Sequence, residues 1–158
     1  MNSTVENVPV PPSWTLWEDA RFAVTTPANP HLPPEEGCHL LVLPKDPPPH
    51  AWADPAVTAA ACELAARVSR VLVHLGLVDW VNLQANGNWG LLPGSTPHLH
   101  VHIYGRRKGG KTWAQPVELP TAPGQFGFAP LAEADRARIA AALAKSLGSA
   151  APGGSVTR

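Results

Sequence analysis

Two spacings of apolar residues along the chain predict strands and helices. Short apolar runs, bounded by proline, glycine or charged residues, predict strands at residues 15–17, 21–24, 39–43 and 80–85. Apolar residues at three- and four-residue steps form one stripe from Val57 to Leu75, which predicts a long helix. Asp54 can cap this helix, with Pro55 at its first position and Gly76 just beyond its end.

A fifth strand is predicted where histidine alternates with apolar residues, over residues 98–104. The segment reads His98-Leu99-His100-Val101-His102-Ile103-Tyr104. In a strand the three imidazoles point to one face and the apolar residues to the other. Core packing does not explain three titratable rings in a row, so the pattern indicates a reaction centre. A second helix is predicted from about Leu131 to Leu147, stopped by Gly148.

The order of strands, long helix, strands and terminal helix predicts an α+β domain with a mainly antiparallel, five-stranded sheet. A length of 158 residues suits one domain, predicted over residues 13–147 between flexible tails at residues 1–12 and 148–158. The 19 prolines lie in clusters, which marks loops between the elements.

The net charge and the cysteines limit the classes of function that this chain is expected to have. The net charge is zero, which argues against an extended nucleic-acid surface or an anionic-membrane surface. No signal peptide and no apolar run of about 20 residues is visible, so a cytoplasmic protein without a membrane partner is predicted. Cys38 and Cys62 lack metal-site spacing and are expected to be buried, reduced thiols.

Four interpretations of the histidine row can be weighed. Zinc is a rival, but the Cα atoms of His98 and His102 would lie roughly 13 Å apart in a strand, too far for one ion without strain. A polar surface strand and a pH-sensitive interface are further alternatives. We favour nucleophilic catalysis, with His100 attacking phosphorus or an acyl carbon and its neighbours handling protons. No metal or other cofactor is expected.

The segment from His98 to Tyr104 resembles the histidine triad (HIT) signature, in which three histidines alternate with apolar residues. Two other segments resemble family motifs in the expected order. Residues 37–45, GCHLLVLPK, are similar to the strand that carries a further active-site histidine, here His39. Asn86-Gly87 is similar to the pair that begins the loop before the triad. The resemblance covers residues 16–104, over half the chain.

The resemblance implies a HIT fold and a nucleotide hydrolase or transferase without a metal. His100 would attack the α-phosphorus of a nucleoside phosphate conjugate, such as a dinucleoside polyphosphate or phosphoramidate, and form a covalent nucleotidyl-histidine. His98, His102 and His39 would support this step. Asn86 and Ser95 would contact the substrate, and the protein would be a homodimer. The alternative is a nucleotide-binding regulatory or interaction protein with negligible turnover.

Three features depart from the family pattern or lie outside it. The usual ribose-binding acidic or amide residue is missing, so either Thr26 takes its place or the ribose contact is absent. His50 follows the Pro-Lys pair late and is expected to be an ordinary loop histidine. The basic loop at residues 106–111 could bind an anionic extension of the substrate or could simply be a solvated turn. Trp80 is expected in the core.

Overall fold

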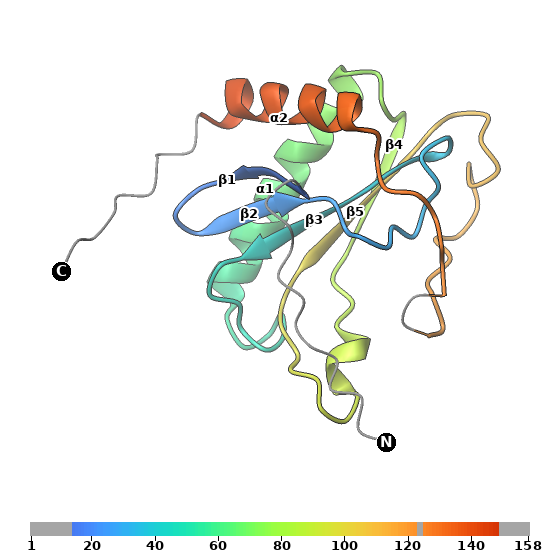
Figure 1. Cartoon of the computed structure of the whole chain (residues 1–158). Coiled ribbons are helices and arrows are strands. Elements are labelled where there is room, and N and C mark those ends of the chain that lie inside the picture. Colours follow the sequence, from blue (N-terminus) through green and yellow to red (C-terminus); the bar gives the residue numbers. More distant parts are fainter. Residues whose placement is uncertain (1–13, 123–124, 149–158) are drawn as a thin grey trace.

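The computed structural model describes residues 14–122 and 125–148, which form one five-stranded antiparallel sheet with helices (Figure 1). The predicted α+β architecture is confirmed. The strands stand in the order β1-β2-β3-β5-β4. Their bounds, with those of the helices, are β1 Thr15–Glu18, β2 Phe22–Thr25, β3 Gly37–Pro44, α1 Pro55–His74, β4 Trp80–Gln84, η2 Asn88–Leu91, β5 Val101–Arg106 and α2 Glu133–Leu147.

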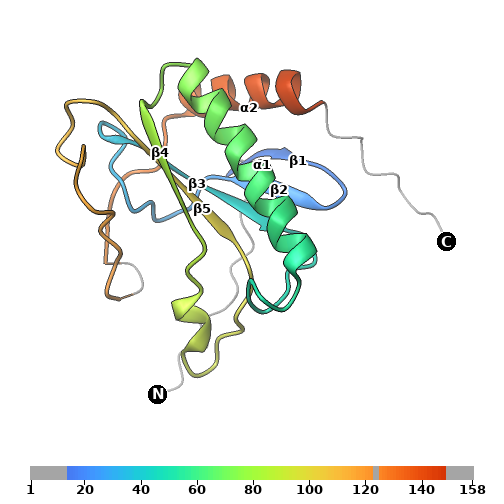
Figure 2. The same cartoon turned by 180° about the vertical axis from the view of Figure 1, so that it is seen from behind.

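The main core lies between the sheet and α1, which crosses one face of the sheet (Figure 2). Val24, Leu40 and Ile103 are fully buried on this face against the stripe of α1 that contains Val68 and Leu72. The helix α2 packs on β1 and α1 and adds Ile139 and Leu143 to the same core. Both helices therefore lie away from the opposite face of β3 and β5, which is left for polar residues.

The strand β5 begins three residues later than the sequence predicts. His98 and His100 precede it in an extended segment, and only His102 of the three lies inside the strand. The ladder between β3 and β5 ends at the pair Val42 and Val101. Beyond this point the chain of β3 runs into Pro44 and Pro47–Pro49, which cannot supply a continuous row of donors. The Leu99 amide instead donates to the Pro48 carbonyl.

The structure differs from three smaller predictions made from the sequence. The helix α2 begins at Glu133, two residues later than predicted. Trp80 is 60% exposed because β4 is an edge strand, paired with a neighbour on one side only. Cys38 is buried as expected, but Cys62 lies on the outer side of α1 and is exposed.

The predicted tails fall almost wholly outside the described residues. No helix in the described part of the chain is long and apolar enough to span a membrane.

The start of α1 is fixed by the Asp54 cap that the sequence predicts. Its carboxylate accepts hydrogen bonds from the amides of Ala56 and Val57, both at 3.0 Å. We expect Asp54→Ala to lower the free energy of unfolding by about 1 kcal/mol, since two helix-terminal donors lose their partner. Urea denaturation measures this change. Asp46→Ala, at an exposed aspartate in the preceding loop, is the matched control, and an equal loss in both variants would contradict the capping role.

Candidate active site

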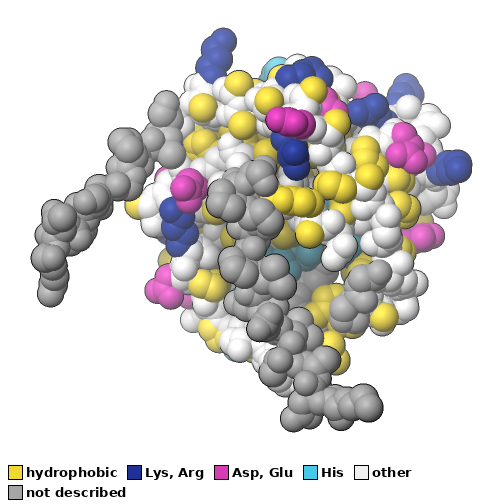
Figure 3. Space-filling model, viewed as in Figure 1, with side chains coloured by type: hydrophobic (Ala, Val, Ile, Leu, Met, Phe, Trp, Pro, Cys, Tyr) yellow, Lys and Arg dark blue, Asp and Glu magenta, His cyan; other side chains and the backbone are white. Residues whose placement is uncertain are grey.

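The histidine row lies on the sheet face opposite α1, and its rings are neighbours. The ring centroids of His98 and His100 are 4.9 Å apart, and those of His100 and His102 are 4.7 Å apart. The alternation therefore continues through the extended segment before β5, with Leu99 and Val101 buried on the other side. Figure 3 shows histidine side chains recessed in the middle of this face of the molecule.

His39 joins the row from the neighbouring strand. In the register of β3 with β5, His39 stands opposite Tyr104, and its Nε2 lies 2.9 Å from Nδ1 of His102. The other ring nitrogen, Nδ1, accepts a hydrogen bond from the backbone amide of His31 at 3.0 Å. The hydrogen bond from the His31 amide fixes the tautomers of His39 and then of His102. Because Nδ1 of His39 accepts, the proton of neutral His39 lies on Nε2. His39 then donates to His102, whose own proton is left on Nε2.

A separate hydrogen bond fixes the tautomer of His100. Its Nδ1 lies 3.1 Å from the carbonyl oxygen of His98, and a carbonyl can only accept. The proton of neutral His100 is therefore on Nδ1, and the lone pair of Nε2 is free. The structure thus pairs an imidazole that presents a lone pair, His100, with one that presents an N–H, His102.

Burial keeps these rings neutral. It lowers the pKa of His100 below its ordinary value and lowers the pKa of His102 to about 3, with repulsion from neighbouring imidazoles acting in the same direction. The pKa of His39 also lies well below its ordinary value, mainly because the ring is removed from water. A neutral imidazole is the form that can act as a nucleophile.

Two members of this cluster were missed by sequence reasoning. The ring of His31 packs 4.5 Å from that of His39, centroid to centroid, and its Nδ1 is hydrogen-bonded to the Tyr104 hydroxyl at 2.9 Å. Tyr104 stacks 4.6 Å from His39 and is fully buried. His31 gives no sequence signal, because it lies in an irregular loop. Tyr104 was assigned only as an apolar position of the motif, although it lies in the same alternation as the histidines.

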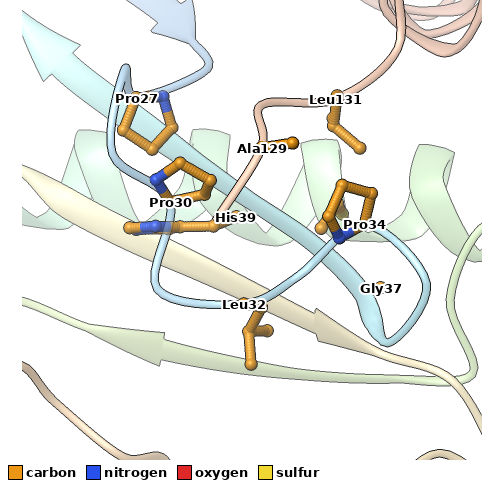
Figure 4. A pocket seen from close by; sticks show the side chains of 9 residues that line it. Pro27, Pro30, Leu32, Pro34, Gly37, His39, Ala129 and Leu131 are labelled. Carbon is orange, nitrogen blue, oxygen red and sulfur yellow. The ribbon is translucent and has the colours of Figure 1, made fainter. Parts of the chain in front are cut away.

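The loop that carries His31 is held over β3 by prolines. A small cavity behind His39 is lined by Pro27, Pro30 and Pro34 from this loop and by Ala129 and Leu131 from the segment before α2 (Figure 4). Proline has a fixed φ, so these residues restrict the backbone that presents the His31 amide. The proline-rich segment is thus part of the support for the His39 tautomer.

A cavity of about 330 Å³ opens beside the exposed end of the row. His98, His100 and Asn86 line it, which places three of the predicted site residues together. His50 also lines this cavity and stacks on Trp52 with centroids 3.9 Å apart, so it is more than the ordinary loop histidine expected. The remaining lining residues are Pro49, Ala51, Ala85, Gly87, Leu91, Pro97 and Leu99.

The structure does not place two of the predicted substrate-contacting residues at this cavity. Ser95 is three residues before His98, but it does not line the cavity, and its amide closes a turn on the Leu92 carbonyl. Thr26 is only 1% exposed, so its hydroxyl is not available to a ribose in this arrangement.

His31, His39 and His102 are the group of described residues that could hold a metal ion, with ligand atoms within 4.8 Å of one another. This group differs from the His98–His100–His102 set weighed from the sequence. Both nitrogens of His39 already take part in hydrogen bonds, so an ion bound to His39 would have to replace one of these two bonds. The hydrogen-bonded cluster is self-consistent without an ion.

Comparisons with known proteins identify the fold. No protein-family model and no curated protein matches the sequence. Among solved structures, a Zn-bound histidine triad family protein from Mycobacterium smegmatis is 23% identical, with 85% of this chain and 86% of that chain covered and a TM-score of 0.59. A histidine triad protein from Bradyrhizobium japonicum is 24% identical, with 84% and 88% covered and a TM-score of 0.56.

A third solved structure is also similar to this chain. It is a hypothetical histidine triad nucleotide-binding protein from Sulfolobus tokodaii, 21% identical, with 85% of this chain and 88% of that chain covered and a TM-score of 0.56. The three structures cover most of both chains, and they share the predicted architecture. The expectation of this fold, drawn from three short motifs, is therefore confirmed.

Proposed function

We propose that this chain, which has the histidine triad fold, is a nucleotide hydrolase or transferase acting at the α-phosphate of a nucleoside phosphate conjugate. The observation that carries the proposal is the state of His100. Its Nδ1 is committed to the His98 carbonyl, its ring is neutral, and its Nε2 is free beside a cavity large enough for a small ligand. The nucleotide-binding description of the Sulfolobus tokodaii structure is consistent with this ligand class.

The proposed reaction has two displacements at phosphorus. In the first, the Nε2 lone pair of His100 forms a bond to the α-phosphorus, and the bond from phosphorus to the leaving group breaks. The leaving group departs with the electron pair and takes a proton. In the second, water or another acceptor attacks the α-phosphorus and loses a proton, and the phosphorus–nitrogen bond breaks to return neutral His100. A mononucleotide, or a nucleotide joined to the acceptor, is released.

The neighbouring imidazoles stabilise this reaction. The tautomer chain from the His31 amide through His39 leaves the Nε2 proton of His102 as a donor toward phosphate oxygens. A fixed donor is more effective than water because it needs no reorganisation as charge develops. His98 is held by a hydrogen bond from its Nδ1 to the Thr96 carbonyl at 3.3 Å and is exposed at the mouth of the cavity. Asn86, which lines the cavity, is assigned to a substrate contact, and the contact of Ser95, which does not line it, stays a prediction from the sequence.

A homodimer is part of the proposal. The outer edge of β4 is open, and its side chains Trp80 and Leu83 are 60% and 40% exposed. An open edge strand with large apolar side chains favours association with a second copy. The free thiols of Cys38 and Cys62 suit a reducing compartment, in agreement with the cytoplasmic location predicted from the sequence.

Trapping the covalent intermediate tests the proposed activity. The protein is mixed with an adenosine phosphoramidate or a dinucleoside polyphosphate labelled at the α-phosphorus, and the reaction is quenched in alkali, in which a phosphorus–nitrogen bond to histidine survives. We expect label on the peptide that contains His100, together with release of mononucleotide. Binding of the nucleotide with neither label nor release, across leaving groups of both kinds, would favour the binding-protein alternative.

A further inference from the structure

Arg106 continues the row of side chains beyond Tyr104, yet the proposed reaction does not use it. In the ladder, Arg106 stands opposite Gly37 of β3 and Trp80 of β4, two residues after Tyr104 on the same face. The residue is only 4% exposed. Arginine is almost never fully buried unless its charge is paired, so the partners of this guanidinium are informative.

No carboxylate within the described residues pairs with Arg106. Its Nη1 donates to the backbone carbonyls of Thr112, at 2.8 Å, and Gln115, while Nε is buried without a hydrogen-bond partner. The nearby carboxylate of Glu36 is committed elsewhere, because its Oε2 accepts from both the amide and the hydroxyl of Thr112. Arg106 is thus a buried cation with neutral partners and an unused donor.

Arg106 lines a second cavity of about 300 Å³, which is separate from the one beside His100. The wall of this cavity is mixed in character. Its apolar part includes Phe126 and Phe128, whose ring centroids are 5.5 Å apart, and its charged part is Arg106 and Lys111 against the exposed Glu118. The other lining residues are His31, Leu32, Pro33, Thr112, Gln115, Pro116 and Val117.

We propose that this cavity, the Arg106 cavity, is a second ligand site that takes a small aromatic molecule with an anionic group. The anion would meet the unused Nε donor of Arg106 and the ammonium of Lys111, since charge-assisted hydrogen bonds are the strongest available to a buried guanidinium. The aromatic part would lie against the two phenylalanine rings. This proposal is independent of the nucleotidyl-transfer reaction.

The neighbouring arginine provides a matched control. The Nε of Arg107 donates to the Leu77 carbonyl at 3.1 Å, and the residue does not line the Arg106 cavity. Arg107→Gln therefore removes one positive charge from the same loop without touching the proposed site. Lys111→Gln removes the same charge from the wall of the cavity, at an exposed position that leaves the fold unaffected.

The test follows the Nε–H resonance of Arg106 by nitrogen-15 NMR while phenyl phosphate is added. We expect a saturable shift, roughly a tenfold weaker Kd in Lys111→Gln, a several-fold weaker Kd in Phe128→Ala, and an unchanged Kd in Arg107→Gln. Phenol should give no shift. Benzoate, titrated in parallel, distinguishes a carboxylate from a phosphate as the preferred anion, and saturation by either one supports the site.

Three results would overturn the proposal. They are the absence of a saturable shift up to about 10 mM phenyl phosphate, an equal shift with phenol, and an equal loss of affinity in Arg107→Gln and Lys111→Gln. The first would show that Arg106 only anchors the backbone of residues 112–115. The readout is local to Arg106 and needs no turnover, so it stands even if the protein fails to cleave any nucleotide.

Discussion

His100→Ala is expected to lower kcat for cleavage of a nucleoside phosphate conjugate by about 10⁴-fold or more. The variant loses the nitrogen that forms the covalent bond, and no neighbouring ring replaces it. His102 presents an N–H rather than a lone pair, and His39 has both nitrogens engaged. Nucleotide binding should change much less, because Asn86 and His98 still line the cavity. Steady-state release of mononucleotide measures kcat, and calorimetry measures the Kd of the nucleotide.

The matched control for this variant is His74→Ala. His74 is an exposed imidazole at the end of α1, whose ring bonds to the Arg70 carbonyl on its own helix. It should retain the wild-type kcat. If His100→Ala keeps its activity within about tenfold of the wild type, the nucleophile has been assigned to the wrong residue, because removal of a covalent nucleophile normally costs far more.

Acidification is expected to destabilise the fold steeply below pH 6.5. Unfolded imidazoles titrate near pH 6.5, whereas burial holds the pKa of His102 at about 3 and that of His39 well below its ordinary value. Above pH 6.5 both states are neutral, so their free-energy difference does not change with pH. Below it the unfolded chain takes up protons that the folded chain excludes. Each ring that stays neutral then costs about 1.4 kcal/mol per pH unit, down to its folded pKa.

Urea denaturation at pH 7, 6 and 5 measures this slope. His102→Gln is the informative variant because it removes one buried imidazole and with it about 1.4 kcal/mol per pH unit of the slope. A free energy of unfolding that stays constant between pH 7 and pH 5 in the wild type would mean that these rings are not held neutral by burial. The tautomer chain through His39 and His102 would then be wrong as well.

Periodicity and breakers predicted most of the fold. The helix α1 was placed at its observed start because Asp54 and Pro55 are local signals that act through the first turn alone. The start of β5 was placed too early because strand length depends on a partner, and the partner strand β3 ends at Pro44. Trp80 was assigned to the core because hydrophobicity does not reveal which strand lies at the edge of a sheet.

The candidate site could be predicted only in part. The alternation that brought out the three histidines continues in the structure through Tyr104 to Arg106, whereas the sequence predicted a strand only over residues 98–104 and placed Arg106 in a basic loop. His31 could not be found in this way, because it acts through a backbone amide and a loop conformation that no side-chain pattern encodes. Thr26 was assigned a role by its place in the motif order, but its burial depends on tertiary packing that the motif order does not reveal.

The burial gradient along the histidine row sets the order of events in the proposed reaction. His98 is exposed, His100 is partly covered, and His102 and His39 are buried. Among the described residues, the cavity that reaches the nucleophile His100 opens at the His98 end of the row. The first product must leave by this entrance before an acceptor can reach phosphorus, which gives a ping-pong sequence. Hydrolysis and transfer then share one intermediate, and the molecule that next occupies the entrance decides between them.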